Sequence, residues 1–405
     1  MNGSGASAPG PFRVCGVRLD RVSTTPLDAL PIEQLRTRTS AKWALYPEDV
    51  LPLFVAEMDF PLAPAVAEAL HAAVERGDTG YSAHGNGIAE AFAGFAARRL
   101  GWDVDPGRVR TTCDVMMGAA ELLRAVTEPG DAVVVTPPVY PPFFAVHEES
   151  RTEAVRVPLV RAGEGWELDL EAIDAAFAAG AKAMLLCNPH NPTGTVHSRE
   201  TLAELARIAE RRGAWIVSDE IHWPLTRPGA TFTPFLDAAP AAAEVGFALA
   251  SASKAFNLAG LKCAQIVTAS AEPARIVRAL PDEVEWRTSI FGAIAGRAAY
   301  ESGEPWLDAL LARLDLNRAL LVDLLADHVP EARYAPGDAG FLAWVDFAGL
   351  GWGDEPSARI LREARVALNP GTTFGDEGRG HARINFGTSP EILADAVERI
   401  GRLRA

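Results

Sequence analysis

Lysine is scarce in this chain of 405 residues. Of its 38 basic residues only four are lysines, and the other 34 are arginines. Arginine stays protonated in proteins, so any chemistry that needs a neutral amine has a short list of candidates. These candidates are Lys42, Lys182, Lys254 and Lys262.

Cysteine is also rare: four residues lie far apart in the sequence and form no C-x-x-C motif. This spacing argues against both a disulfide framework and a zinc site. We therefore expect no metal ion, and we expect free thiols in a reducing compartment, the cytoplasm.

Long apolar runs are absent as well. No stretch of about 18 apolar residues occurs, so the sequence offers no candidate for a membrane-spanning helix. The opening residues MNGSGASAPGPF lack a basic region followed by an apolar stretch, so we interpret residues 1–12 as a disordered lead rather than a secretory signal. The net charge of −15 disfavours contact with a phosphate backbone, and we expect no nucleic-acid partner.

Short apolar runs are what the sequence does contain. They lie at 132–136, 183–187, 214–218, 247–251 and 264–268. Runs of this length without alternation are typical of strands buried on both faces of a parallel sheet. A helix is predicted over 198–213, with Ser198 as its N-cap and Gly213 at its end. Strand, helix and strand in succession predict an α/β sheet with helices on both faces.

The pattern changes after Pro281. A long helical stretch without buried strands is predicted over 286–328, followed by apolar segments at 340–347 and around RINFG. A chain of this length exceeds what one hydrophobic core usually fills, so two domains are expected. We predict an N-terminal segment (13–60) packing with the small domain, a large α/β domain (61–285) and a small α+β domain (286–405).

Polar residues follow three of the predicted strands directly. Asn191 lies in the loop after 183–187, Asp219 and His222 follow 214–218, and Lys254 follows 247–251. Open α/β sheets bind ligands at the carboxyl ends of their strands, so an amide, a carboxylate and a lysine are expected to converge there. The sequence contains no G-x-x-x-x-G-K-[ST], H-E-x-x-H or G-x-S-x-G motif that would indicate another chemistry.

This set of groups suits pyridoxal 5'-phosphate (PLP). A lysine amine forms a Schiff base with an aldehyde, and a carboxylate can keep a pyridine nitrogen protonated, which makes the ring an electron sink. An amide can donate a hydrogen bond to the ring hydroxyl. Amides at the start of the helix after Asp114 could bind the phosphate.

Several motifs carry a family resemblance. The segments CNPHNPTG (187–194), VSDEIH (217–222), SASKAFNLAGLK (251–262) and ARINFGTS (382–389) resemble those of fold-type I PLP enzymes of aminotransferase class I/II. The segments KW (42–43), LPLFVAEMDFP (51–61) and TGY (79–81) are similar to those of the MalY/PatB cystathionine β-lyase group. The resemblance extends from about residue 40 to the end of the chain, and it implies an aspartate aminotransferase-like fold.

The resemblance also implies roles for individual residues. Lys254 would hold the cofactor and move the Cα proton, Asp219 would pair with the ring nitrogen, and Arg383 would bind the substrate carboxylate. The other implied positions all contact the cofactor. Asn191 and His222 would lie at the ring hydroxyl and Tyr140 on the ring face, with Val115, Met116, Ser251, Ser253 and Lys262 around the phosphate and Tyr81 at the phosphate of a partner subunit.

The function that this resemblance implies is α,β-elimination on a small amino acid with sulfur at Cβ, such as cystathionine, by a homodimer. An aminotransferase is the first alternative, because it uses the same lysine, aspartate and arginine. A regulatory protein that retains the fold is the second alternative. Two departures from the family pattern stand out: Asp114 places an acid next to the expected phosphate site, and Glu57 replaces the more usual aspartate of VADMDF.

Overall fold

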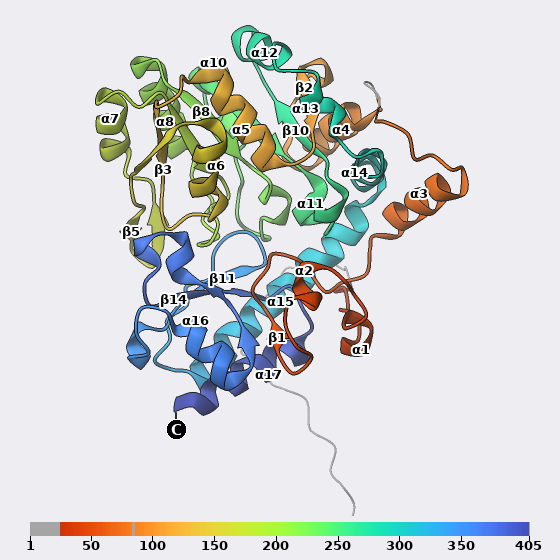
Figure 1. Cartoon of the computed structure of the whole chain (residues 1–405), viewed down its shortest axis with the longest axis vertical. Helices are drawn as coiled ribbons and strands as arrows, with labels where there is room; N and C mark the ends of the chain where they lie inside the picture. Colours follow the sequence, from red (N-terminus) through yellow and green to blue (C-terminus); the bar gives the residue numbers. More distant parts are fainter. Residues whose placement is uncertain (1–24, 83–85, 405) are drawn as a thin grey trace, which may run out of the picture.

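The centre of the molecule is a seven-stranded sheet with helices on both sides (Figure 1). The structure is a computed structural model, and it describes residues 25–82 and 86–404. The predicted lead (1–12) and Cys15 lie outside the described residues. The strands follow the order β2 (Val109–Thr112), β10 (Ala264–Val267), β9 (Gly246–Ala250), β8 (Trp215–Asp219), β7 (Ala183–Cys187), β3 (Ala132–Val135) and β4 (Glu153–Arg156).

The five apolar runs found in the sequence are the five central strands of this sheet. Their residues alternate between two cores, so both faces of each strand are buried. Met184 and Leu186 face one core, whereas Leu185 and Cys187 face the other. The run at 264–268 differs from our prediction in direction, because β10 is antiparallel to both of its neighbours. Burial on both faces gives the same apolar pattern in either direction.

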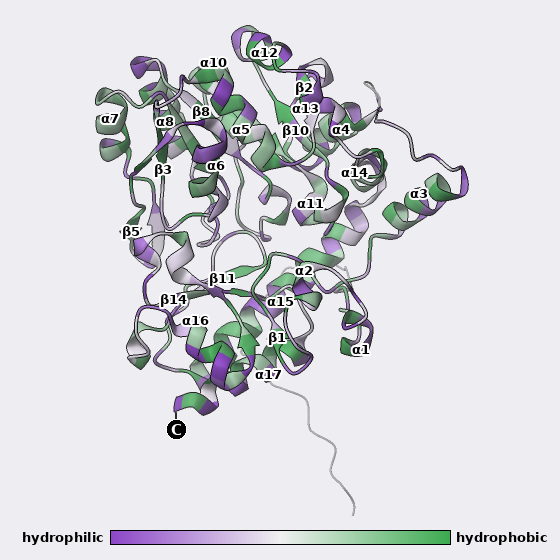
Figure 2. Ribbon diagram, in the orientation of Figure 1, coloured by the Kyte–Doolittle hydropathy of each residue, from purple (hydrophilic) through white to green (hydrophobic). Residues whose placement is uncertain are grey.

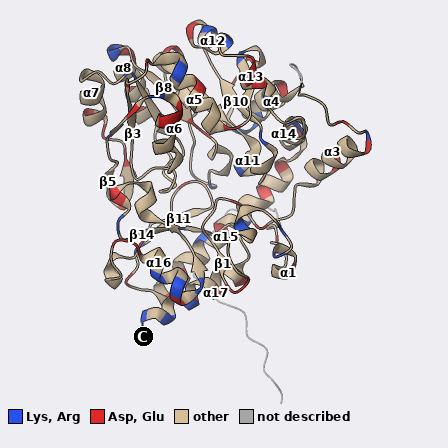
Figure 3. Cartoon of the chain, in the orientation of Figure 1, with Lys and Arg blue, Asp and Glu red and all other residues tan. Residues whose placement is uncertain are grey.

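The helices on each side of the sheet pack against a core of their own. The core that contains Leu185 is covered by α5 (Val115–Val126), α6 (Pro142–Ser150) and α12 (Ala271–Arg278). The other core includes residues of α4, α8 and α14. Figure 2 shows hydrophilic and hydrophobic residues side by side on α12, and Figure 3 shows acidic and basic residues interspersed over the outer helices. The remaining helices of this part are α3 (Pro64–Glu75), α4 (Ile88–Leu100), α7 (Leu170–Ala178), α8 (Arg199–Arg212), α9 (Phe235–Ala238), α10 (Pro240–Val245), α11 (Ala252–Ala255), α13 (Glu283–Trp286) and α14 (Ile290–Ser302).

A smaller antiparallel sheet lies beside the large one. Its strands follow the order β11 (Leu342–Asp346), β14 (His381–Asn385) and β13 (Asn369–Pro370). Next to it lie α15 (Glu304–His328), α16 (Pro356–Arg359) and α17 (Pro390–Gly401). The helical stretch expected over 286–328 is divided at Gly303, where a Cβ atom would lie only 2.5 Å from the Ala299 carbonyl oxygen. These elements agree with the predicted α+β composition, while the exact domain boundaries stay a prediction.

The N-terminal segment joins the C-terminal part through a short parallel pairing of β1 (Leu51–Pro52) with β12 (Val366–Ala367). Two short helices, α1 (Ile32–Leu35) and α2 (Ala41–Ala44), precede β1, and the hairpin β5 (Val160–Ala162) and β6 (Gly165–Glu167) lies between β4 and α7. In the described part of the chain, no helix combines the length and apolar character needed to cross a membrane.

A buried ion pair fixes this N-terminal segment. Lys42 Nζ lies 2.7 Å from Asp59 Oδ2, and the two side chains are 1% and 0% exposed. The Trp43 indole donates a hydrogen bond of 2.8 Å to the other carboxylate oxygen. Burial lowers the pKa of Lys42, and the neighbouring Asp59 carboxylate opposes that shift. Both charges are therefore paired away from water, where the loss of either partner is costly.

Replacing Lys42 should therefore destabilise the fold strongly. Lys42→Met keeps the length of the side chain but leaves Asp59 buried without a cation, so we expect the free energy of unfolding to fall by about 3–5 kcal/mol. The control is Arg365→Met, which removes the exposed ion pair with Asp49 and should change stability little. Equal effects of the two substitutions in urea unfolding would contradict the structural role given to Lys42.

Candidate active site

The carboxyl ends of three parallel strands bring the predicted site residues together. Cys187 at the end of β7 pairs with Asp219 at the end of β8, and Asp219 pairs with Leu249 of β9. Asn191 lies four residues beyond β7, and Lys254 lies in α11 immediately after β9. The strand ends that the sequence analysis singled out thus meet at one edge of the sheet.

Arg383 reaches this edge from the smaller sheet. It lies on the central strand β14, and its Nη1 donates a hydrogen bond of 3.2 Å to Asn191 Oδ1. Its Nη2 donates 2.9 Å to the Phe54 carbonyl. The side chain is only 2% exposed, and burial lowers its pKa to about 10, which leaves the guanidinium charged at neutral pH. Its Nε is buried without a partner in the described structure, so the guanidinium can still bind an anion.

Lys254 is held by the segment 54–58. Its Nζ donates a hydrogen bond of 3.0 Å to the Ala56 carbonyl. Burial lowers the pKa of Lys254 to about 8, Arg383 lowers it further, and Glu57 and Asp219 act in the opposite direction. A lysine with this pKa has a substantial neutral fraction near pH 7–8, which a nucleophilic amine requires.

Asp219 and His222 are buried groups without a full set of partners. Burial raises the pKa of Asp219 to about 6, while the Ile221 amide and the Lys254 charge lower it. Burial lowers the pKa of His222 to about 3, with smaller contributions from Lys254 and Arg383. His222 is therefore neutral, and its Nδ1 has no hydrogen-bond partner within the described residues. A buried carboxylate with a raised pKa gains stability from a cationic ligand, such as a protonated ring nitrogen.

Tyr140 also lies within reach of these charges. Burial raises the pKa of Tyr140, Arg383 lowers it, and Asp219 and Asp114 raise it further. The residue precedes α6, and its ring lies 6.3 Å from that of Phe143 in an edge-on arrangement. The role of Tyr140 on the face of a bound ring stays a prediction.

The predicted phosphate contacts gather at the start of α5. Val115 and Met116 are the first residues of this helix, and their amides make no hydrogen bond with the described residues. Lys262 Nζ lies 2.9 Å from Asp114 Oδ2. Ser251 Oγ donates to the Cys263 carbonyl at 2.7 Å, and it also lies 2.7 Å from Ser253 Oγ.

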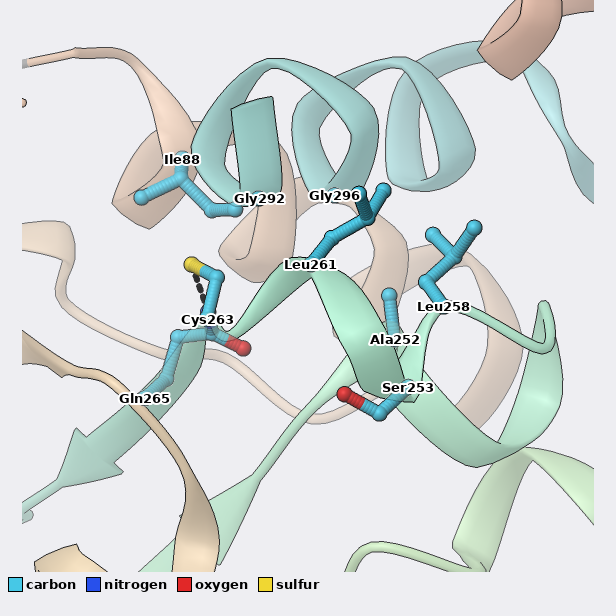
Figure 4. Close-up of a pocket in the computed structure, with 9 residues that line it drawn as sticks. All are labelled: Ile88, Ala252, Ser253, Leu258, Leu261, Cys263, Gln265, Gly292 and Gly296. Carbon is cyan, nitrogen blue, oxygen red and sulfur yellow. Dashed lines mark hydrogen bonds between the residues drawn. The ribbon is translucent and has the colours of Figure 1, made fainter. Parts of the chain in front are cut away.

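A small cavity lies behind Ser253 (Figure 4). It lies between η3 (Ala259–Leu261) and α14, and its volume of about 10 Å³ is that of a single water molecule. The helices η3 and α14 can lie this close together because Gly292 has no side chain. A Cβ atom at this position would lie 2.2 Å from the Leu261 carbonyl oxygen. This cavity is too small for a cofactor.

Tyr81 is not brought to this site. Its side chain is 84% exposed, and its ring contacts Trp286 edge-on with centroids 6.0 Å apart. Because the role expected of Tyr81 lies in a partner subunit, that role stays a prediction.

Sequence reasoning missed the residues that hold the segment 54–58. Asn385 Nδ2 donates to the carbonyls of Val55 and Glu57 at 2.7 and 2.6 Å. Asn257 contacts the backbone of Met58 through both ends of its amide, and its positive φ of 59° places it in the left-handed region. The motif LPLFVAEMDFP (51–61) was recognised in the sequence. The two asparagines bind only its backbone, however, so no pattern of side chains in the motif pointed to them.

The residues present fit PLP as a ligand. A carboxylate with a raised pKa suits a protonated ring nitrogen, and an unpartnered histidine nitrogen and an amide lie near the same place. Two free helix amides and a lysine suit a phosphate. Among the described residues, no group of three or more His, Cys, Asp or Glu could hold a metal ion.

This chain resembles known proteins over most of its length. Residues 48–400 match the family model described as "Aminotransferase class I and II". A protein of Mycobacterium leprae with the provisional name cystathionine beta-lyase is 46% identical, with 94% of this chain and 98% of that protein covered. Cystathionine beta-lyase PatB of Bacillus subtilis is 34% identical, with coverage of 91% and 97%. A crystal structure from Corynebacterium diphtheriae, provisionally titled a PLP-dependent beta-cystathionase, has a TM-score of 0.89 and 36% identity, with coverage of 93% and 98%.

Asp219→Asn separates the charge of this residue from its shape. We expect turnover with PLP to fall by about 100-fold or more, as when other electrostatic contacts at reacting centres are lost. The raised pKa means that the folded protein binds this proton more tightly than the unfolded chain does, so the stability from this group is lost as the pH rises through about 6.

The PLP-free Asp219→Asn variant should therefore be more stable than the parent at pH 8 and similar to it at pH 4. Thermal unfolding at the two pH values and steady-state rates provide the measurements. Turnover close to that of the parent would show that Asp219 does not support the ring nitrogen.

Proposed function

The chain belongs to the aminotransferase class I and II family and, within it, to the MalY/PatB group, and on this basis we propose that it is a PLP-dependent carbon–sulfur β-lyase. It catalyses α,β-elimination on an amino acid with sulfur at Cβ, such as cystathionine, and releases pyruvate, ammonia and a thiol. The observation that carries this proposal is the convergence of Lys254, Asp219 and Arg383 at one edge of the sheet.

Each of these residues has a defined task in the reaction. Bound PLP supplies an electron sink for the negative charge that develops at the substrate Cα. Arg383 binds the α-carboxylate, for which its unpartnered Nε and a second Nη proton form a planar fork. Asp219 would pair with the ring nitrogen and keep it protonated. Lys254, with its pKa near 8, takes the Cα proton as a base and returns a proton to the departing sulfur as an acid.

Other residues orient the cofactor. Asn191 and His222 lie at the strand ends beside Asp219, where they would contact the ring hydroxyl, and Tyr140 would cover the ring face. Val115, Met116, Ser251, Ser253 and Lys262 would hold the phosphate.

The direct test is an assay of the purified protein loaded with PLP. L-Cystathionine should yield pyruvate and thiol in equal amounts, and Lys254→Ala should abolish both turnover and the visible absorbance of lysine-bound PLP. Lys182→Ala is the matched control and should leave both unchanged, because Lys182 precedes β7 at the opposite end of the strand from Cys187.

Two outcomes would contradict the proposal. Exchange of amino groups with a keto acid, without release of thiol, would identify an aminotransferase. Binding of PLP without turnover of any amino acid would favour a regulatory protein that retains the fold. If Lys182→Ala abolished the absorbance and Lys254→Ala did not, the assignment of the lysine would be wrong.

The protein acts as a homodimer in this proposal, with Tyr81 of each subunit at the phosphate of the other. The exposed side chains of Leu62, Val74 and Tyr81 support an apolar contact on and around α3. The proposed location is the cytoplasm, which agrees with the free thiols of Cys113, Cys187 and Cys263. Light scattering coupled to gel filtration tests the dimer.

Arg383→Lys tests recognition of the substrate carboxylate. Lysine keeps the charge but loses the planar fork, so we expect a loss of about 2–3 kcal/mol in transition-state binding, which corresponds to a roughly 30- to 150-fold lower kcat/KM. The exposed Arg379 provides the control, and Arg379→Lys should leave kcat/KM unchanged. An unchanged kcat/KM in Arg383→Lys would remove this residue from the substrate site.

A further inference from the structure

Asp114 occupies the N-terminus of α5 with its own carboxylate. Its Oδ1 accepts a hydrogen bond of 2.9 Å from the Met117 amide, so it is the N-cap of the helix. Its Oδ2 lies 2.9 Å from Lys262 Nζ, and the two side chains are 34% and 56% exposed. One carboxylate thus uses both a helix amide and the lysine of this region.

The same region is where the cofactor phosphate is expected. The amides of Val115 and Met116, directly after Asp114, have no partner in the described structure. Of the other expected contacts, Ser251 already donates its hydroxyl to the Cys263 carbonyl, and Lys262 is already neutralised by Asp114. A phosphate that binds here therefore meets an anion of the protein next to Lys262, the lysine expected to bind it.

The charge of Asp114 also reaches the interior of the site. It raises the pKa of the Tyr140 hydroxyl, as the charge of Asp219 does, after the larger effect of burial. Together with the contact to Lys262, this effect indicates that Asp114 adds negative charge to the expected phosphate site.

We propose that Asp114 is an internal anion that competes with the cofactor phosphate for Lys262 and thereby weakens the binding of PLP. This inference rests on the proposed function, because it takes PLP as the cofactor. When PLP binds, Lys262 exchanges the carboxylate for the phosphate, and Asp114 remains as the N-cap of α5. Two anions that bind the same lysine repel each other, and removing the charge of Asp114 should change the affinity for PLP at least about tenfold.

Asp114→Asn removes the charge and keeps the cap, because asparagine and aspartate are equally good N-cap residues. PLP-free protein is titrated with PLP, and binding is followed by absorbance and by quenching of tryptophan fluorescence. We expect the Kd for PLP to fall about tenfold or more, since the repulsion is gone and Lys262 is free. Inorganic phosphate should also compete with PLP more strongly in the variant than in the parent.

Two controls test whether the change in affinity depends on the position of Asp114 and on the phosphate of the ligand. Asp169 caps α7 in the same way, with a hydrogen bond of 2.9 Å from the Ala172 amide, and Asp169→Asn should leave the Kd unchanged. Pyridoxal, which lacks the phosphate, should bind the parent and Asp114→Asn with the same affinity. Asp114→Ser, another uncharged N-cap residue, should reproduce the gain if the asparagine variant folds poorly.

Equal or weaker binding of PLP by the folded Asp114 variants would overturn this inference, as would an equal gain for pyridoxal. These results leave the proposed function intact, because the parent still binds PLP. The absence of any PLP signal in parent and variants alike would instead overturn the proposed function, and this inference with it.

Discussion

The site depends on one short backbone segment that holds two buried cations in place. The carbonyls of Phe54 and Ala56 accept hydrogen bonds from Arg383 and Lys254, which come from different sheets or their adjacent helices. The segment is fixed from behind by Asn385 and by Lys42, whose Nζ donates to the Glu57 carbonyl at 3.1 Å. Backbone carbonyls carry no net charge, so they can orient both cations without neutralising the charge that substrate and cofactor must meet.

Burial then sets the charge state of each group. It lowers the pKa of Lys254 to about 8 and that of His222 to about 3, and it raises that of Asp219 to about 6. Near pH 7 the site therefore holds a charged arginine, a lysine that loses its proton close to pH 8, a carboxylate and a neutral histidine. None of these groups is fully compensated by a partner within the described chain, which is the expected condition of a site that awaits a charged ligand.

Much of this could be predicted from the sequence, because buried strands leave a local pattern. The five apolar runs became the central strands, and polar residues at their ends marked Asn191, Asp219 and Lys254. The direction of β10 could not be predicted, because burial on both faces has the same pattern in either direction. The backbone segment 54–58 and its supports Asn257 and Asn385 were missed as well, since their contacts join residues up to 330 positions apart. Such contacts depend on the docking of the smaller sheet rather than on any local preference.

Asp114 shows how a local rule and a functional expectation can both hold at one residue. Aspartate is a favoured N-cap residue, whereas an acid beside a phosphate site is unfavourable. The structure satisfies the first rule through the Met117 amide and reduces the conflict through Lys262. The helix amides of Val115 and Met116 stay free because the Asp114 side chain bonds the third amide of the helix, that of Met117, rather than the first two. A carboxylate can therefore cap the helix while leaving the ligand its backbone donors, and the conflict that remains is one of charge, between two anions that share one lysine.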